Sequence, residues 1–323
     1  MRAIWIALLG VAVLAGSASG ATKGGSIALV AYSTPKDAYG QIISAFQKTK
    51  AGNGTNFSQS YGASGDQARA VAAGQPADLV ALSLAPDIDL LAKKGLVARN
   101  WAANAHKGIV SDSVVVFVVR DGNPKHIKGW GDLIKPGVQV ITPNPFTSGG
   151  ARWNVMAAYG AERKAGKTDK QAIAYVERMM RNVVSLDTSG RNATNSFLAG
   201  RGDVFITYEN EARLAKLQYV IPRQTLLIEA PIAVIKTSDN KGLATKFVRF
   251  TRTPQAQRIF AQYGFRPLLP SVYREFEKQY PKRPGIFEIG DRYIGGWKAV
   301  EKRWFDPDKG LWVGIAKRTG LGT

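Results

Sequence analysis

Residues 143–154 read Pro-Asn-Pro-Phe-Thr-Ser-Gly-Gly-Ala-Arg-Trp-Asn and join a predicted strand to a predicted helix. The strand is the short apolar run 138–141, and the helical pattern continues through residues 153–159. Thr147 or Ser148 is a candidate N-cap, because a hydroxyl can accept a hydrogen bond from an unpaired amide of the first helical turn. The next two residues are glycines, so a ligand could approach their backbone N–H groups closely. Such a helix start predicts a site for a small anion.

Two other strand-to-helix junctions carry Ser and Gly in the same place. Residues 62–67 read Gly-Ala-Ser-Gly-Asp-Gln, and Ser64 with Gln67 matches a capping box. Residues 188–193 read Thr-Ser-Gly-Arg-Asn-Ala. Together the three junctions predict that helix N-termini converge on one small anion.

Strands and helices alternate along the first hundred residues, which predicts a parallel sheet with helices on its faces. The β-branched run 113–119 is typical of a buried strand and is interpreted as crossing into a second lobe. Residues 226–228 and 232–235 are interpreted as strands that return. Ligands of such sheets bind beyond the strand C-termini, where the three junctions lie.

The expected fold is therefore α/β with two lobes, each a mixed sheet flanked by helices, and a ligand cleft between them. Lobe one is predicted to comprise residues 22–112 plus 232–323, and lobe two residues 113–231. The tail is rich in proline and aromatic residues, and we expect it to pack against lobe one.

Residues 1–21 are predicted to be a secretory signal peptide rather than part of the fold. Arg2 precedes the apolar run 4–15, and small residues follow up to a cleavage site near Ala21. The run is short for a membrane span, and the chain has no Cys for a lipid anchor or a disulfide. We expect a periplasmic protein without stable membrane insertion.

The chain carries 44 Lys and Arg against 24 Asp and Glu, a net charge of +20. Such a charge attracts anions, but the basic residues are scattered and no nucleic-acid-binding motif accompanies them. We therefore expect a solvated basic surface and no nucleic-acid partner.

The sequence contains few residues in patterns typical of catalysis or metal binding. The two histidines, His106 and His126, match neither a nucleophile nor a metal-ligand pattern. Glu209 and Glu211 flank Asn210, where capping or a salt bridge explains them better than paired acid–base chemistry; docking to a permease is an alternative. We expect no enzyme, no metal and no cofactor.

The chain resembles the periplasmic sulfate-binding proteins that feed ABC importers. The resemblance is carried by residues 60–65, 120–130, 138–154 and 202–211, which include Asn-Pro-Phe-Thr-Ser-Gly-Gly-Ala-Arg-Trp-Asn and Gly-Asp-Val-Phe-Ile-Thr-Tyr-Glu-Asn-Glu. It implies the type II periplasmic binding protein fold and delivery of sulfate to an ABC permease. We also expect the protein to be a monomer. It also implies that neutral donors hold the sulfate without a balancing cation.

The resemblance places the ligand-binding groups on matching positions. It implies amides at Ser64, Gly149, Gly150 and Gly190, and hydroxyls at Ser148 and, in addition to its amide, at Ser64. Arg191 matches an arginine that buttresses the site.

Two candidate site residues depart from the family pattern. Tyr208 replaces a Trp that binds the ligand, and Ser33 replaces an Asp. An indole N–H can only donate, whereas a phenol can donate or accept. Thiosulfate, molybdate and tungstate therefore stay open as ligands. An organosulfonate is a further alternative, with Tyr61, Phe146 and Tyr208 lining an apolar extension.

Overall fold

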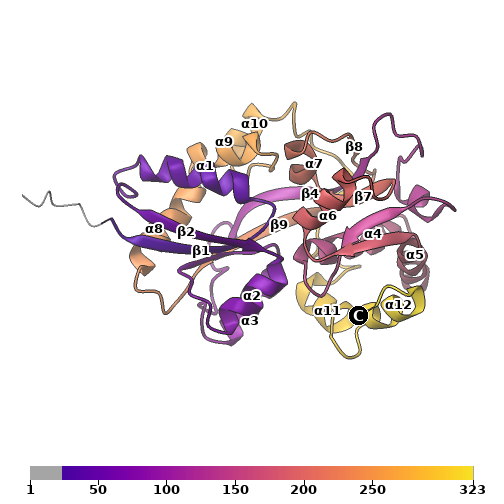
Figure 1. Cartoon of the computed structure of the whole chain (residues 1–323), viewed down its shortest axis with the longest axis horizontal. Helices are drawn as coiled ribbons and strands as arrows, with labels where there is room; N and C mark the ends of the chain where they lie inside the picture. Colours follow the sequence, from indigo (N-terminus) through magenta and orange to yellow (C-terminus); the bar gives the residue numbers. More distant parts are fainter. Residues whose placement is uncertain (1–23, 323) are drawn as a thin grey trace, which may run out of the picture.

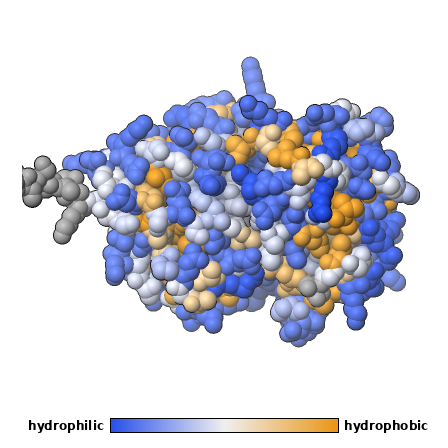
Figure 2. All heavy atoms as spheres, viewed as in Figure 1, coloured by the Kyte–Doolittle hydropathy of each residue, from blue (hydrophilic) through white to orange (hydrophobic). Residues whose placement is uncertain are grey.

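The computed structural model describes residues 24–322. The predicted signal peptide lies outside the described residues. Two α/β lobes lie side by side, joined by long strands between them (Figure 1). The viewed face of both lobes is mostly hydrophilic (Figure 2). Within residues 24–322, no helix combines the length and the hydropathy that crossing a membrane requires.

Lobe one is built on three parallel strands, with β1 between the other two. The strands are β1 (Ser26–Tyr32), β2 (Asn56–Gly62) and β3 (Leu79–Ala81). Its helices are α1 (Lys36–Gln47), α2 (Ser64–Ala72), α3 (Ala85–Lys93), α8 (Lys241–Thr251), α9 (Pro254–Gln262) and α10 (Pro270–Glu275). One apolar cluster joins the sheet to α1, α8 and α9, and another joins it to α2 and α3, so helices cover both faces.

Lobe two has a mixed sheet in which β5 pairs in parallel with both β6 and β7. Its strands are β5 (Val140–Pro143), β6 (Val183–Asp187), β7 (Val204–Tyr208), and the short β8 (Tyr219–Val220) and β10 (Ile286–Phe287). Its helical elements are the 3-10 helix η1 (Trp130–Ile134), α4 (Gly149–Lys164), α5 (Asp169–Arg181), α6 (Gly190–Leu198), α7 (Glu209–Leu214), α11 (Gly296–Trp304) and α12 (Leu311–Thr319).

Two antiparallel strands cross between the lobes, β4 (Ile109–Val119) and β9 (Thr225–Val234). The strand order is β2-β1-β3-β9-β4-β7-β5-β6. The first half of β4 pairs with β9, and the second half pairs with β7 in lobe two. The far end of β9 pairs with β3 in lobe one. The two-lobed α/β fold predicted from the sequence is confirmed.

The return crossing is a single strand, not the two short strands predicted at 226–228 and 232–235. Pro231 suggested a break because proline cannot donate to a strand ladder. In the structure Pro231 lies opposite Ile109, where the register of β4 shifts by one residue. A bulge removes the need for that donor, so the strand continues through the proline.

The last two helices pack mainly against lobe two, whereas we expected the whole tail to pack against lobe one. The start of the tail does contact lobe one, through α10 against α9, and α11 also contacts α3. Tyr280 still reaches lobe one, where its hydroxyl donates to the carbonyl oxygen of Ala261 at 2.7 Å. The two last helices instead contribute Trp304 and Trp312 to the core that contains α4 and α5. Trp304 stacks edge-on against Tyr159 of α4, with ring centres 4.9 Å apart. Aromatic composition predicted burial of the tail but carried no information about which lobe offers the matching surface.

Candidate functional site

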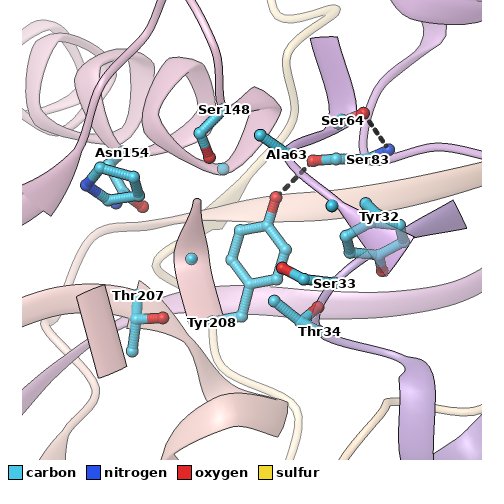
Figure 3. Close-up of a pocket in the computed structure, with 14 residues that line it drawn as sticks. Tyr32, Ser33, Thr34, Ala63, Ser64, Ser83, Ser148, Asn154, Thr207 and Tyr208 are labelled. Atoms are coloured by element: carbon cyan, nitrogen blue, oxygen red, sulfur yellow. Dashed lines mark hydrogen bonds between the residues drawn. The ribbon is translucent and has the colours of Figure 1, made fainter. Parts of the chain in front are cut away.

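A small cavity lies between the lobes, walled by uncharged residues (Figure 3). Its fourteen lining residues are Tyr32, Ser33, Thr34, Gly62, Ala63, Ser64, Ser83, Pro143, Ser148, Gly150, Asn154, Gly190, Thr207 and Tyr208. Its volume is 20 Å³. One water needs about 10–15 Å³ on the same scale, so the cavity suits a very small solute.

Three helices begin at this cavity, as the Ser/Gly junctions predicted. Ser64 is the first residue of α2, Gly149 of α4 and Gly190 of α6. Ser33 lies on the wall at the end of β1, just before α1. Each helix start brings unpaired N–H groups and the positive end of a helix dipole toward the same space.

The predicted capping box at the first junction is wrong. Helix α2 begins at Ser64 itself, with Ala63 as N-cap and no side-chain cap. The Gln67 amide instead bonds Ser60 and the carbonyl oxygen of Ala31 on the strands beneath. The sequence matches a capping box, but the buried Gln67 side chain forms its hydrogen bonds with the sheet and not with the helix start.

The Ser64 hydroxyl forms hydrogen bonds within the protein and does not donate to a ligand. It donates to the Asp87 carboxylate and accepts the backbone N–H of Ser83 at 2.8 Å. Asp87 is itself buried, and this burial raises the pKa of its carboxyl, although Arg152 and the Ser64 hydrogen bond act in the opposite direction. The hydroxyl donation expected from Ser64 is therefore directed to Asp87, which leaves its backbone amide for the cavity.

Ser148 and Ser189 precede their helices in different ways. Ser148 is the N-cap of α4, but its side chain makes no capping hydrogen bond. It lies on the cavity wall and is 4% exposed. Ser189 caps α6 by accepting from the N–H of Asn192 at 3.1 Å. Ser189 is not among the lining residues, so of these two serines only Ser148 can donate its hydroxyl hydrogen into the cavity.

Gly149 and Gly150 differ in what their missing side chains allow. A Cβ on Gly149 would lie 2.7 Å from a Leu84 methyl carbon and 2.8 Å from Ser83 Oγ, both in lobe one. A Cβ on Gly150 would lie 3.3 Å from Ser148 Oγ and 3.4 Å from the hydroxyl oxygen of Tyr208. Gly149 thus permits the lobes to approach, and Gly150 keeps the cavity open beside two hydroxyls.

Tyr208 ends β7 and reaches across the cavity to lobe one. Its hydroxyl oxygen lies 2.6 Å from Ser83 Oγ, and either atom can be the donor (Figure 3). Burial raises the pKa of the Tyr208 phenol well above its ordinary value. The phenol therefore keeps its proton and stays able to donate or to accept.

Arg191 lies outside the cavity wall and joins the lobes. It forms an ion pair with Glu211 at 3.0 Å and reaches the carbonyl oxygen of Thr34 and the Asp37 carboxylate, each at 3.5 Å. Burial raises the pKa of the Glu211 carboxyl, while the Arg191 charge lowers it. This position agrees with a buttress rather than a direct ligand.

Glu209 and Glu211 are structural, as predicted from their helix start. Arg266 pairs with Glu209 at 2.8 Å, and Arg191 pairs with Glu211. The alternative that these glutamates dock a permease is wrong, because Glu209 is 0% and Glu211 2% exposed. His126 is exposed and, among the described residues, no group of three or more His, Asp or Glu side chains could hold a metal ion.

The proposed apolar extension is not part of this cavity. Tyr208 lies on the wall, but Tyr61 and Phe146 are not among the lining residues. Tyr61 instead donates to Gln59 on its own strand at 2.8 Å. An organic group attached to an anion has no continuation of the cavity there.

Sequence reasoning missed Ser83, which is central to the site. Ser83 lies between β3 and α3, at a fourth strand-to-helix junction. It lacks a neighbouring glycine, so the Ser/Gly pattern passed over it. The rule that ligands lie beyond strand C-termini would have selected this junction.

Two α/β lobes, joined by crossing strands and closed over a small cavity at helix N-termini, define a solute-binding protein of the two-lobed clamp type. The family model for bacterial extracellular solute-binding proteins matches residues 27–266. The chain belongs to this family, and within it to the sulfate-binding proteins.

Named relatives match nearly the whole chain. The sulfate-binding protein of Synechococcus elongatus is 41% identical, over 90% of this chain and 86% of its own length. The thiosulfate-binding protein of Pseudomonas aeruginosa is 36% identical, over 85% of this chain and 88% of its own length. Among solved structures, the sulfate-binding protein SubI from Mycobacterium tuberculosis H37Rv superposes with a TM-score of 0.85 at 45% identity. That match covers 87% of this chain and 100% of SubI.

Proposed function

We propose that this protein captures sulfate in the cavity between its lobes and delivers it to an ABC permease outside the cytoplasm. The observation that carries the proposal is the convergence of α2, α4 and α6 on a cavity whose lining residues are all uncharged. The sulfate-binding relatives support the choice of ligand. The protein acts as a monomeric binding protein and not as an enzyme.

The ligand is held by neutral donors. These are the amides of Ser33, Ser64, Gly149, Gly150 and Gly190, with the hydroxyls of Ser148 and Tyr208. Each helix N-terminus adds about 0.3–1 kcal/mol of favourable interaction with an anion, and more where water is excluded. Fixed dipoles replace the hydration shell without a long charged side chain that would have to be ordered.

Closure completes the site. The lobes turn about β4 and β9, and the division between them falls within these two strands, near residues 112 and 231. We assign α11 and α12 to lobe two because their core is shared with α4 and α5. Arg191 then holds the closed form from outside the cavity.

The cavity volume favours a single small oxyanion over an organosulfonate. Thiosulfate is the second candidate, because a thiosulfate-binding relative matches most of the chain. Molybdate and tungstate are larger tetrahedral ions and require a wider cavity.

The direct test is calorimetric titration of ligand-free protein that starts at Thr22. Sulfate is expected to bind and thiosulfate to bind more weakly. Ser148→Ala removes one hydroxyl donor and should weaken sulfate binding about ten- to hundredfold, since a hydrogen bond to a charged group contributes about 1.5–3 kcal/mol. Ser44→Ala, on the exposed side of α1, is the matched control. Failure of both sulfate and thiosulfate to bind would overturn the proposal.

A further inference from the structure

Two hydroxyl groups from different lobes meet on the cavity wall. Ser83 belongs to lobe one and Tyr208 to lobe two, and both line the cavity. Their oxygens lie 2.6 Å apart, and the residues are 1% and 3% exposed (Figure 3). A hydrogen bond between them forms only when the lobes are closed.

Ser83 has little freedom apart from the direction of its hydroxyl hydrogen. Its backbone N–H donates to Ser64 Oγ at 2.8 Å, and its carbonyl oxygen accepts from the Trp153 indole at 2.9 Å. Trp153 belongs to α4 in lobe two, so Ser83 is bonded to both lobes through its main chain as well. The position of Ser83 Oγ is therefore fixed relative to Tyr208.

The pair holds two hydroxyl hydrogens, of which one lies in the bond between the two oxygens. When Ser83 donates to Tyr208, the Tyr208 hydrogen is available to the cavity. When Tyr208 donates to Ser83, a lone pair of Tyr208 is available to accept instead. Exchange between the two arrangements needs only hydroxyl rotation.

We propose that Ser83 and Tyr208 form a donor–acceptor switch, which lets the site take hydrogen-bearing tetrahedral oxyanions such as hydrogen phosphate as well as fully ionised sulfate. The inference rests on the proposed function, because it concerns the same site. A donor-only indole at position 208 would favour the fully ionised ligand alone, since the hydrogen of a protonated oxyanion would meet no acceptor.

Asn154 also lies on the wall, but its amide oxygen is not exposed to the cavity. The Asn154 side chain is 1% exposed, and its NH₂ group donates to Thr142 Oγ1 at 3.0 Å and to the carbonyl oxygen of Ile206 at 2.8 Å. These two bonds fix which end of the amide is the oxygen. That oxygen has no hydrogen-bond partner within the described residues. Because this oxygen is fully buried, it supplies no acceptor to the ligand, and that role falls to the pair of Ser83 and Tyr208.

The test compares sulfate and hydrogen phosphate by calorimetric titration, at a neutral to mildly alkaline pH where phosphate keeps one proton. The parent protein should bind both. Tyr208→Trp should lower the affinity for hydrogen phosphate relative to sulfate by about tenfold or more, because the acceptor is lost. Tyr208→Phe should weaken both ligands and change their ratio much less.

Ser83→Ala gives a second readout in case the indole does not fit. Without Ser83 Oγ, the Tyr208 hydrogen has no acceptor when Tyr208 accepts from the ligand. Hydrogen phosphate should therefore lose more affinity than sulfate, and Ser44→Ala should change neither.

If the parent protein binds sulfate but not hydrogen phosphate, the switch is wrong and the proposed function still holds. An unchanged ratio of affinities in both Tyr208→Trp and Ser83→Ala would overturn the switch as well. Failure to bind either anion would overturn both proposals.

Discussion

The backbone N–H of Gly65 in lobe one donates to the carbonyl oxygen of Thr147 in lobe two at 3.0 Å. The first turn of α2 is thus bonded directly to the segment that leads into α4. Arg69 reinforces the contact by donating to the neighbouring carbonyl oxygen of Phe146 at 3.0 Å. The structure is therefore the closed form, and its interlobe contacts can be tested separately from the ligand contacts.

Gly149→Ala should prevent full closure. Its Cβ would lie 2.7–2.9 Å from Leu84 and Ser83 atoms, and contacts this short force the lobes apart. We expect sulfate affinity to fall by at least about tenfold, a loss of about 1.4 kcal/mol of binding free energy, while the fold is retained. Calorimetric titration measures the affinity and circular dichroism the fold.

Gly242→Ala is the matched control, because it lies in the first turn of α8 and its Cβ would meet nothing within 4 Å. Parent-like sulfate binding by Gly149→Ala would show that the lobes need not approach this closely.

Arg266→Met should destabilise the fold strongly. The pair of Arg266 with Glu209 is buried, with side chains 4% and 1% exposed. Removal of one partner leaves an unpaired buried charge, which costs about 3–5 kcal/mol. Urea unfolding measures the change in the free energy of unfolding.

Arg258→Met breaks a solvent-exposed pair with Glu275 and should reduce the free energy of unfolding far less than Arg266→Met does. Equal losses in the two arginine variants would contradict the assignment of Glu209 to a structural role.

Asp87→Asn should remove part of the pH dependence of stability. Burial raises the pKa of the Asp87 carboxyl above its ordinary value of 3.8. Between those two pKa values the folded state binds more protons than the unfolded state, so the free energy of unfolding falls as pH rises. Asparagine does not titrate and lacks this decline.

We will find the effect by urea unfolding from about pH 4 to about pH 7. Over this range the free energy of unfolding of Asp87→Asn should increase relative to that of the parent as the pH rises. A difference that stays constant over this range would contradict the raised pKa. The comparison is specific because both proteins share every other titrating group.

Trp312→Ala should loosen lobe two rather than lobe one. Trp312 is 1% exposed and shares its core with Tyr175 and Met179 of α5. Truncation of a buried Trp costs about 3–5 kcal/mol. Hydrogen exchange should quicken in α4 and α5 more than in α1, and the exposed Lys317→Ala should have little effect. Faster exchange confined to α1 would contradict the assignment of α12 to lobe two.

Local patterns in the sequence were enough for the fold class and for the helix starts that surround the cavity. The β-branched run of β4 gave a buried crossing strand, and the Ser/Gly junctions gave the starts of α2, α4 and α6. These features depend on hydrogen bonds and sterics within a few residues, so they can be read from neighbours in the chain.

Long-range packing settled what those patterns left open. The Ser64 hydroxyl turned to Asp87, 23 residues away, and Tyr208 met Ser83 from the other lobe, 125 residues away. The last helices found their apolar partner on α4 and α5. The partner of a buried side chain depends on which distant segments pack together in the folded protein. The identity of that partner therefore cannot be read from any short stretch of sequence.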